Sequence, residues 1–455
     1  MTPPPNRTRS STRRSRRATP SPSRVQWTGP DRVRVPVTDL GAHGHGLARH
    51  DGQPLYIPDA LPGETVEVRI VDRVGDGWRA EVLSHLDPSP DRVEPVCPHF
   101  GPCGGCTLQH LRPAAQAAWK RQQIIDAVTK RGLPVPDVDP VVAIPPGHRR
   151  RCTLGWRRTA RAVLLGFHGQ DSHRLEDVHT CPMVASDLFV LFASLRALLE
   201  DITGAGDAGQ AILTLTDTGA DCTLTLDRPP TLAIRERLAA FAEDADLARL
   251  GWLSNGTVEP VVERRPPTVL MAGTPVRLPP LAFLQPSREG AEAIIEAVRA
   301  RLPASDGAAL DLYAGMGTVT FPLAAEGRAV HAVDENADSI AALSAAVAPG
   351  QPITTAVRNL DSDPVGGAAL HAFEAVVFDP PRAGARAQAT ALASDGPPHI
   401  VAVSCRPATF ARDARILVDA GYALGRITTI DQFPWAAHVE LVAGFERRPA
   451  AALSD

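Results

Sequence analysis

Residues 400–407 read IVAVSCRP, an apolar run that ends on a cysteine, an arginine and a proline. A short run of β-branched and small apolar residues before a proline is typical of a strand that is buried on both faces, as in a parallel sheet. Pro407 suits the first turn of a helix. Cys405 is therefore expected at the carboxyl end of a strand, the edge at which open α/β sheets bind their ligands.

The expected position of Cys405 also predicts its reactivity. The amino end of a helix carries partial positive charge, which lowers the pKa of a neighbouring thiol below its ordinary value of about 8.5. Because the thiolate is the nucleophilic form, a lowered pKa increases reactivity near neutral pH. We therefore expect Cys405 to be a nucleophile with a lowered pKa.

Two upstream segments predict a nucleotide-binding sheet. Residues 308–318 read AALDLYAGMGT, an apolar run followed by a glycine-rich turn, and residues 329–334 read AVHAVD. An acid at a strand end, here Asp334, can accept hydrogen bonds from a ribose. The turn lacks both the third glycine of a dinucleotide fingerprint and the Gly-Lys-Ser of a phosphate-binding loop. These features favour a nucleoside without a pyrophosphate, which indicates S-adenosylmethionine.

Two further acids follow or begin apolar runs. Residues 375–384 read AVVFDPPRAG, in which the proline after Asp379 fixes the backbone just beyond the sheet and directs Asp379 into the same crevice. Residues 433–445 read FPWAAHVELVAGF, in which Glu440 stands at the edge of the last apolar run. Glu440 is a candidate general base.

The length of 455 residues predicts about three domains. Residues 1–24 contain seven arginines and no acid, although the net charge of the chain is −4. Such a Ser- and Pro-rich arm is expected to be disordered and to bind polyanions; a solvated tail or an incorrectly assigned start codon explains it equally well. The arm lacks the apolar region of a secretory signal, and no later stretch has 18 apolar residues. We expect a cytoplasmic protein that does not contact membranes.

Residues 25–90 contain short alternating runs, such as VRVPV at 33–37 and TVEVRIV at 65–71, between Gly- and Asp-rich turns. This pattern predicts a small β-barrel, and barrels of the OB type often bind single-stranded nucleic acid. Others act only as spacers. The phrases GAHGHGLA at 41–48 and LPGE at 61–64 resemble the TRAM domain, an RNA-binding barrel attached to RNA-modifying enzymes.

Residues 97–110 read CPHFGPCGGCTLQH and predict a metal site. Cys103 and Cys106 can hold one metal group, and the glycines between them allow a tight turn. Cys152 and Cys222 lie in strand-like alternation and are expected in the core. Structural zinc usually takes two close pairs of ligands, so one pair with two single cysteines favours an iron–sulfur cluster, with zinc as the alternative. The expected ligands are Cys97, Cys103, Cys106 and Cys181.

Residues 148–151 read HRRR beside a predicted strand. Consecutive arginines usually form a solvated face. Near a barrel and a cluster, Arg149, Arg150 and Arg151 are equally good candidates for contacts with RNA phosphates.

Together these motifs resemble the family of S-adenosylmethionine-dependent RNA uracil-5-methyltransferases, specifically its iron–sulfur, TRAM-containing 23S rRNA branch. The resemblance implies an α/β protein with a Rossmann-like class I methyltransferase domain (residues 281–455) built on a mostly parallel seven-stranded sheet. A central α+β domain (residues 91–280) would carry a [4Fe-4S] cluster on the four cysteines. Cys405 falls on the family's nucleophile, Glu440 on its proton acceptor, and Phe283 on an aromatic residue that stacks in the RNA site. The donor-binding positions, with two residues of the glycine turn included, are Gln285, Tyr313, Gly315, Thr318, Asp334, Asn359 and Asp379.

The chain departs from the family pattern in a few places. Arg406 replaces the usual Asn after the nucleophile, Thr318 replaces a common Asn, Asp334 is one methylene shorter than the common Glu, and Trp435 is unusual. Arg406 bears on the substrate more than on the type of reaction.

The resemblance implies a monomer that methylates C5 of a uridine, with 23S rRNA favoured over tRNA. Two other activities stay open. The DPP motif is similar to that of purine amino-methyltransferases, although Arg382 stands where those enzymes have an aromatic residue. The chain could also be a noncatalytic iron–sulfur protein that binds RNA.

Overall fold

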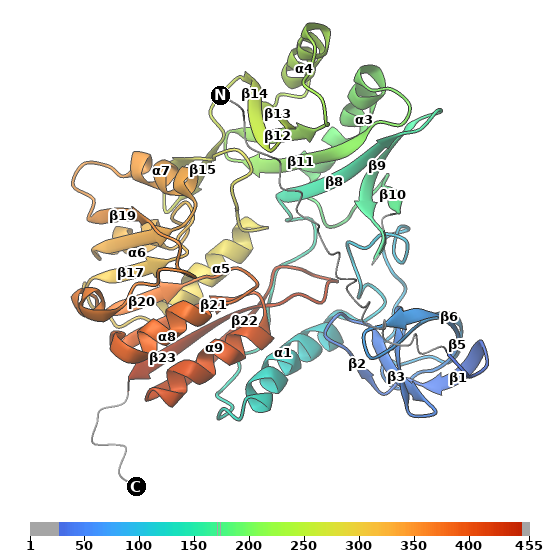
Figure 1. The fold of residues 1–455 in the computed structure, drawn as a ribbon, viewed down its shortest axis with the longest axis horizontal. Coiled ribbons are helices and arrows are strands. Elements are labelled where there is room, and N and C mark those ends of the chain that lie inside the picture. Colours follow the sequence, from blue (N-terminus) through green and yellow to red (C-terminus); the bar gives the residue numbers. More distant parts are fainter. Residues whose placement is uncertain (1–26, 171, 173, 448–455) are drawn as a thin grey trace, which may run out of the picture.

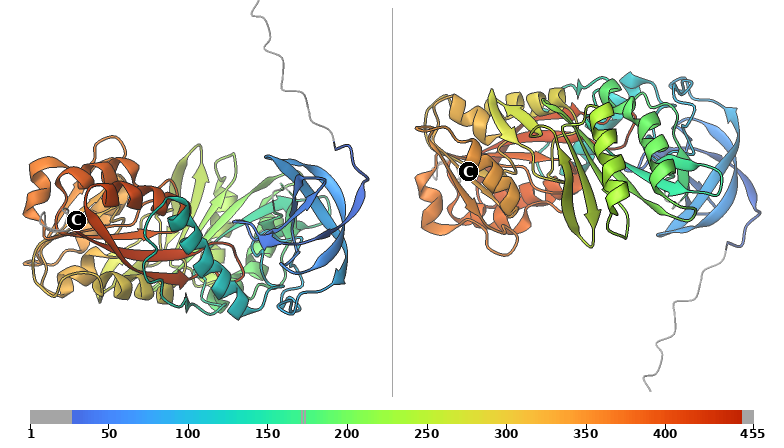
Figure 2. Two further views of the ribbon diagram at one scale, coloured as in Figure 1. Left: turned by 90° about the horizontal axis from the view of Figure 1, so that it is seen from below. Right: turned by 90° about the horizontal axis from the view of Figure 1, so that it is seen from above.

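The computed structural model describes residues 27–170, 172 and 174–447, so the predicted basic arm over residues 1–24 lies outside the described residues. Three large sheets follow one another along the chain (Figure 1). The views in Figure 2 show the first sheet at one end of the molecule and the C-terminal sheet at the other. In the part of the chain that the structure describes, no helix is long and apolar enough to span a membrane.

The first sheet is a six-stranded barrel-like unit with the strand order β1-β5-β6-β4-β3-β2. Alternate residues of its strands point into a core around Val33, Val66 and Leu55, which explains the alternating sequence pattern. Its strands are β1 (Arg32–Pro36), β2 (Asp39–Leu40), β3 (Gly46–His50), β4 (Gln53–Ile57), β5 (Thr65–Val74) and β6 (Gly77–Asp87).

The central sheet has seven strands in the order β10-β9-β8-β11-β12-β13-β14. Cys152 and Cys222 are buried in its core, as predicted. The strands are β8 (Arg151–Arg158), β9 (Val163–His168), β10 (Leu175–Asp177), β11 (Ala208–Thr216), β12 (Gly219–Thr225), β13 (Arg249–Ser254) and β14 (Thr257–Glu263). The accompanying elements are α2 (Ser186–Phe189), α3 (Leu191–Ile202), α4 (Leu232–Asp244) and a hairpin of β15 (Thr268–Met271) and β16 (Thr274–Arg277).

The C-terminal sheet has the strand order β19-β18-β17-β20-β21-β23-β22-β7. Strands β17 to β21 are parallel and β23 runs antiparallel beside β21, which confirms the predicted seven-stranded α/β sheet. The strands are β17 (Ala309–Leu312), β18 (Val330–Asp334), β19 (Ile353–Val357), β20 (Ala375–Phe378), β21 (His399–Ser404), β22 (Tyr422–Asp431), β23 (Glu440–Arg447) and the short eighth strand β7 (Val142–Ala143).

Helices cover both faces of this sheet (Figure 1). Ile400 and Ala402 of β21 pack into the cluster that contains residues of α8 and α9, whereas Val401 and Val403 pack into the cluster that contains residues of α5 and α6. Burial on both faces explains why the strand sequence is apolar without alternation. The helices are α5 (Arg288–Arg299), α6 (Thr320–Ala325), α7 (Ala337–Ala346), α8 (Arg386–Asp395), α9 (Pro407–Asp419) and the 3₁₀ helix η1 (Gly367–Ala372).

Helix α1 (Pro113–Lys130) and strand β7 of the segment 91–280 join the C-terminal unit, the helix in its core and the strand at the edge of its sheet. The helix places Ile124 and Val128 in the same cluster as residues of β17, β20 and β21. Strand β7 pairs in parallel with the end of β22. Residues around 113–143 are therefore packed on the sheet that carries the predicted active site, while the domain boundaries near residues 90 and 280 stay a prediction.

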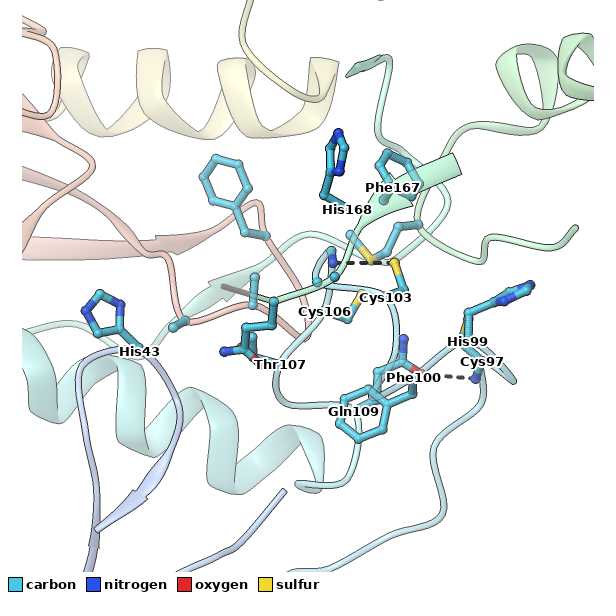
Figure 3. A pocket seen from close by; sticks show the side chains of 18 of the residues that line it. His43, Cys97, His99, Phe100, Cys103, Cys106, Thr107, Gln109, Phe167 and His168 are labelled. Atoms are coloured by element: carbon cyan, nitrogen blue, oxygen red, sulfur yellow. Dashed lines mark hydrogen bonds between the residues drawn. The ribbon is translucent and has the colours of Figure 1, made fainter. Parts of the chain in front are cut away.

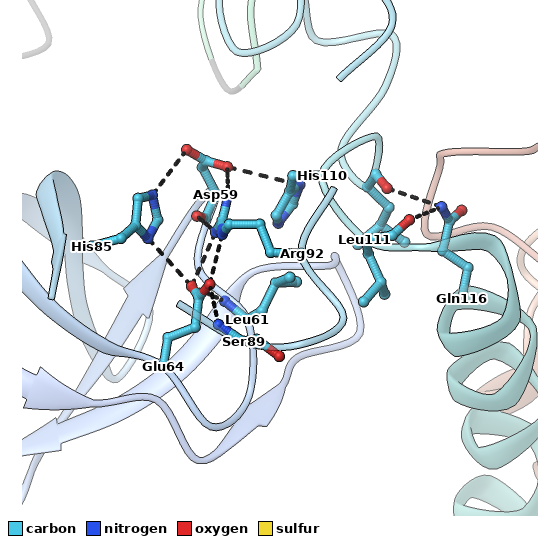
Figure 4. Close-up of polar contacts among 10 residues, drawn as sticks. Asp59, Leu61, Glu64, His85, Ser89, Arg92, His110, Leu111 and Gln116 are labelled. Carbon is cyan, nitrogen blue, oxygen red and sulfur yellow. Dashed lines mark hydrogen bonds and ion pairs between the residues drawn. The ribbon is translucent and has the colours of Figure 1, made fainter. Parts of the chain in front are cut away.

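A buried polar network joins the first sheet to the segment that follows it, residues 91–112, which contains Cys97, Cys103 and Cys106 and is called here the cysteine-bearing segment (Figure 4). The Glu64 side chain is fully buried and accepts a hydrogen bond from Arg92 Nε (2.6 Å). Arg92 also donates to the carboxylate and the backbone carbonyl of Asp59. His85 lies between the two acids. The position of the barrel is thereby fixed by charged groups that cannot easily be separated, because separation would leave a buried charge without its partner.

Candidate active site

The sheet brings the two predicted catalytic residues together. Cys405 follows β21, and Glu440 is the first residue of β23. Because the antiparallel register pairs Ser404 with Leu441, the next position places Cys405 beside Glu440. The side chains are close enough for the Glu440 charge to raise the pKa of the Cys405 thiol.

The predicted lowering of the Cys405 pKa is wrong. Burial, followed by the charges of Glu440 and Asp379, raises the pKa of Cys405 to about 11, although Arg382 opposes the rise. Helix α9 does begin at Pro407, as predicted. The dipole effect amounts to about 1 kcal/mol and is smaller than the cost of burying a thiolate beside two carboxylates.

A chain of buried hydrogen bonds leads from Asp379 to Glu440. Gln285 Nε2 donates to Asp379 Oδ2 (3.2 Å), Gln432 Nε2 donates to Gln285 Oε1 (3.0 Å), and the same nitrogen donates to Glu440 Oε1 (3.3 Å). Gln432 was not found from the sequence. Its position directly before the segment that leads to Glu440 is the only signal it gave.

Both acids at the ends of this chain have raised pKa values. Burial raises the pKa of Asp379 to about 7. Burial and the neighbouring Asp379 raise the pKa of Glu440 to about 8, whereas the Gln432 hydrogen bond and Arg382 lower it. A carboxyl group with a pKa near neutrality can both accept and release a proton during turnover.

Arg382 and His438 form a second pair that the sequence did not identify as functional. Arg382 Nη2 lies 3.3 Å from His438 Nε2. Burial, and then Arg382, lowers the pKa of His438 to about 4, so the ring is neutral near pH 7. Arg382 directly follows the DPP motif, which was the available sequence signal.

The predicted donor-binding residues lie along the carboxyl edge of the sheet. Asp334 Oδ2 accepts a hydrogen bond from the Gly315 amide (2.9 Å), which ties the glycine turn to the next strand. Tyr313 has a positive φ of 60°, and its buried hydroxyl has no hydrogen-bond partner among the described residues. Asn359 Nδ2 donates to Glu335, and its Oδ1 accepts from the backbone of the following turn.

Thr318 lies beside the segment that leads to Gln285. It lines a cavity of about 610 Å³ between α5, the β15–β16 hairpin and Arg150. Leu284, the neighbour of Gln285, lines the same cavity.

The predicted RNA-binding residues have different environments. Phe283 is 65% exposed, and the Arg151 guanidinium lies 5.7 Å from its ring centre. Arg150 Nε donates to the Gln285 carbonyl, and burial lowers its pKa to about 10. Arg149 lines the cavity that contains the four predicted cluster cysteines. Arg151 and Phe283 present a cation and an aromatic face at the surface, whereas Arg150 supports the backbone of the site.

The four predicted cluster cysteines line one cavity of about 1010 Å³. Figure 3 shows Cys97, Cys103 and Cys106 there, opposite Phe167 and His168. The Gly105 amide donates to Cys103 Sγ (3.5 Å). Burial raises the pKa of Cys106 to about 12, and the other three cysteines add to the rise. The donor set consists of thiols supplied with backbone amides, which is the environment that thiolate-bound clusters use.

The arrangement does not by itself establish a metal site. Among residues 27–170, 172 and 174–447, no group of three or more His, Cys, Asp or Glu side chains is arranged to hold a metal ion. The iron–sulfur cluster therefore stays a prediction.

The cysteine-bearing segment contacts the loop that leads to Glu440. The amides of Thr107 and Leu108 both donate to the Trp435 carbonyl, at 2.7 and 2.9 Å. Trp435 has a positive φ of 61°. The loop between β22 and β23 is therefore hydrogen-bonded to a segment that carries predicted cluster ligands.

Two family models match the chain. Residues 31–73 match the TRAM domain, and residues 367–448 match the tRNA (uracil-5-)-methyltransferase family. The second match includes both Cys405 and Glu440.

Relatives match nearly the whole chain. An uncharacterized RNA methyltransferase of Rhizobium meliloti (strain 1021) is 38% identical over 91% of this chain and 99% of its own length. One of Caulobacter vibrioides is 39% identical over 90% of this chain and 99% of its own length. The 23S rRNA (uracil(1939)-C(5))-methyltransferase RlmD of Enterobacter sp. (strain 638) is 32% identical over 91% of this chain and 96% of its own length.

A solved structure has the same fold. The tRNA (uracil-54, C5)-methyltransferase of Pyrococcus abyssi, in complex with S-adenosyl-L-homocysteine, matches with a TM-score of 0.71 and 24% identity. The match covers 91% of this chain and 100% of that one. Shared length, shared sequence and the two matched models show that the chain belongs to the RNA uracil-5-methyltransferase family.

Proposed function

We propose that the protein transfers a methyl group from S-adenosylmethionine to C5 of a uridine in RNA through a covalent bond to Cys405. The observation that carries the proposal is the placement of Cys405 beside Glu440, with the hydrogen-bond chain from Asp379 ending on Glu440. The nucleophile can activate C5 by adding to the ring, and a carboxyl group with a pKa of about 8 can remove the proton from C5.

The proposed sequence of steps begins from the thiolate form of Cys405, after its proton has been lost to solvent. Its Sγ adds to C6, which moves an electron pair to C5 and the neighbouring carbonyl. C5 then takes the methyl group, and the donor leaves as a neutral thioether. Glu440 removes the proton from C5, the C5–C6 double bond forms again, and the sulfur leaves as a thiolate. The uridine must leave its stack to reach Cys405.

The proposed substrate is large-subunit ribosomal RNA. The TRAM match and the 32% identity to the Enterobacter 23S rRNA enzyme support this choice, while the matched family model carries a tRNA name. Phe283 and Arg151 at the surface are suited to stack on a base and to contact phosphate. A monomer in the cytoplasm, where ribosomal RNA is located, is part of this proposal.

The first experiment changes Cys405 to Ala. RNA from a strain that lacks the enzyme is incubated with labelled donor, and the modified nucleoside is identified in 23S rRNA and in tRNA. The wild type should form 5-methyluridine, and Cys405→Ala should reduce it at least 10⁴-fold while donor binding persists. Substantial residual methylation, or a methylated purine, would reject the proposed chemistry; labelled tRNA alone would reject the proposed substrate.

Changing Glu440 to Gln tests the second step. This variant should still form the bond between Cys405 and RNA but should resolve it about 10²- to 10⁴-fold more slowly. The adduct is measured as a shifted band on a denaturing gel. If Glu440→Gln formed product without any retained adduct, Glu440 would not be the base.

Four cysteines are proposed to hold a [4Fe-4S] cluster, because they line one cavity and one of them, Cys103, accepts a hydrogen bond from a backbone amide. A cluster of this type would contribute fold stability by cross-linking the two segments that carry its thiolates. The proposed ligands are Cys97, Cys103, Cys106 and Cys181.

The cluster is tested by iron content. Protein purified without oxygen should contain iron and absorb visible light as a brown solution, and changing Cys103 or Cys181 to Ser should remove most of the iron. Cys152→Ser and Cys222→Ser are matched controls from the central core and should keep it. Wild-type protein that contains zinc, or no metal, would contradict the assignment.

A further inference from the structure

One amide side chain connects the donor-side residues with the base. Gln432 Nε2 donates to Gln285 Oε1 (3.0 Å) and to Glu440 Oε1 (3.3 Å). Gln432 is only 4% exposed, so water does not compete for these bonds. In this orientation Gln285 uses its own nitrogen to donate to Asp379 and leaves its oxygen to accept, whereas Gln432 Oε1 is buried without a hydrogen-bond partner among the described residues.

The backbone on both sides of Gln432 is anchored. Lys120 Nζ of α1 lies 2.6 Å from Asp431 Oδ1 and donates to the Phe433 carbonyl (2.9 Å). The Phe433 amide donates to Asp431 Oδ1 (3.0 Å). Lys120 is completely buried. These contacts hold the backbone around Gln432 independently of the contacts that its side chain makes.

Helix α5 leaves room for the Gln432 side chain at Gly290. A Cβ atom on Gly290 would overlap Gln432 Oε1 and approach Gln432 Cβ to 2.9 Å. Glycine within a helix costs about 1 kcal/mol relative to alanine. The space that this glycine leaves is occupied by the amide that links Gln285 and Glu440.

We propose that Gln432 is a positioning residue for the methyl-transfer site, which holds the Glu440 carboxyl group in place relative to Gln285 and favours its ionised form. The inference rests on the proposed function, because it assigns Glu440 as the base. An amide nitrogen can only donate, and a donor stabilises a carboxylate more than a carboxylic acid.

The other charged or titratable groups beside Glu440 are Asp379, Arg382 and Cys405. Asp379 raises the pKa of Glu440, and Arg382 lowers it. The charge of Glu440 raises the pKa of Cys405, which stays an uncharged thiol in the range where Glu440 titrates. The hydrogen bond from Gln432 and the charge of Arg382 both lower the pKa of Glu440, whereas burial and Asp379 raise it. Loss of the hydrogen bond should therefore raise the pKa, so that Glu440 stays protonated to higher pH.

The test follows the decay of the methylated adduct between Cys405 and RNA by rapid quench from pH 6 to 10. In this step the sulfur is already bonded to C6, so the ionisation of the free thiol does not affect the rate. Replacing Gln432 with Met keeps a similar volume and removes the donor. Gln432→Met should shift the rising limb of the decay profile upward by about one pH unit, which is about a tenfold slower decay at pH 7.

A second variant and a matched control separate positioning from stability. Gly290→Ala, which displaces Gln432 without changing it, should shift the profile in the same direction. Gln388→Met removes a buried glutamine that bonds only to the backbone of Val365, and it should lower thermal stability without shifting the profile.

Two results would overturn the role of Gln432. One is a decay profile of Gln432→Met that falls by the same factor at every pH without a shift. The other is a Gly290→Ala variant with a wild-type profile. Wild-type protein that forms no adduct and no 5-methyluridine would instead reject the proposed function itself, so the two failures are distinguishable.

Discussion

Three acids in the C-terminal sheet, Asp311, Asp379 and Glu440, are buried deeply enough to retain protons near neutral pH. Burial raises the pKa of Asp311 to about 7, of Asp379 to about 7 and of Glu440 to about 8. Asp311 accepts a hydrogen bond from Thr320 at the start of α6, away from the hydrogen-bond chain. At the scale of the residue, burial therefore decides the protonation of the site, and this is also why Cys405 has a raised pKa.

These pKa values predict how stability depends on pH. Each acid has a higher pKa in the folded than in the unfolded chain, so the folded state binds more protons between the two values and loses stability as pH rises. We expect the free energy of unfolding to fall by about 3 kcal/mol between pH 6.5 and 8.5, most of it from Glu440. Urea unfolding at several pH values measures this slope.

Glu440→Gln is the control for that slope, because a glutamine does not titrate. This variant should lose more than half of the decrease. A wild-type slope in Glu440→Gln would mean that Glu440 is already ionised at pH 6.5.

At the scale of secondary-structure elements, α1 determines the position of the β22–β23 loop. Gln116 accepts a hydrogen bond from the Trp435 amide and donates to the carbonyls of Leu108 and Leu111. One turn later, Lys120 binds Asp431 and the Phe433 carbonyl. The helix therefore connects the cysteine-bearing segment to the loop that carries Gln432.

Changing Lys120 to Met should destabilise the protein by about 3–5 kcal/mol, because Asp431 is left buried without its partner. Lys130→Met at the exposed end of the same helix should cost less than about 0.5 kcal/mol. Denaturant unfolding of both variants gives the comparison. Equal effects would show that the Lys120–Asp431 pair contributes little to the fold.

At the scale of the whole molecule, the barrel is held to the cysteine-bearing segment by a few buried charges. Arg92 is the centre of this contact, since it binds both Glu64 and Asp59 (Figure 4). The barrel loop also reaches the segment directly, because a Cβ on Gly44 would come within 3.1 Å of Leu108. A shift of the barrel would therefore disturb the segment that holds Trp435.

Arg92→Met should cost about 3 kcal/mol and should make the chain easier to cleave near residue 90, while donor binding stays unchanged. Arg112→Met, which breaks an exposed ion pair with Asp91, is the matched control and should cost less than about 1 kcal/mol. Limited proteolysis and calorimetric titration with donor measure the two effects. Loss of donor binding in Arg92→Met would show that the barrel contact supports the methyltransferase sheet as well.

The sequence by itself determined the sheet, because strands buried on both faces must be apolar and their ends can be read from Cys405, Asp379 and Asp334. It also indicated which cysteines belong to the core, since Cys152 and Cys222 lie in regular alternation. Only the tertiary structure decided that Gln432 meets both Gln285 and Glu440, and that Cys405 has a raised pKa. Both depend on how far buried groups lie from one another across different strands, and such distances are set by packing rather than by any local pattern.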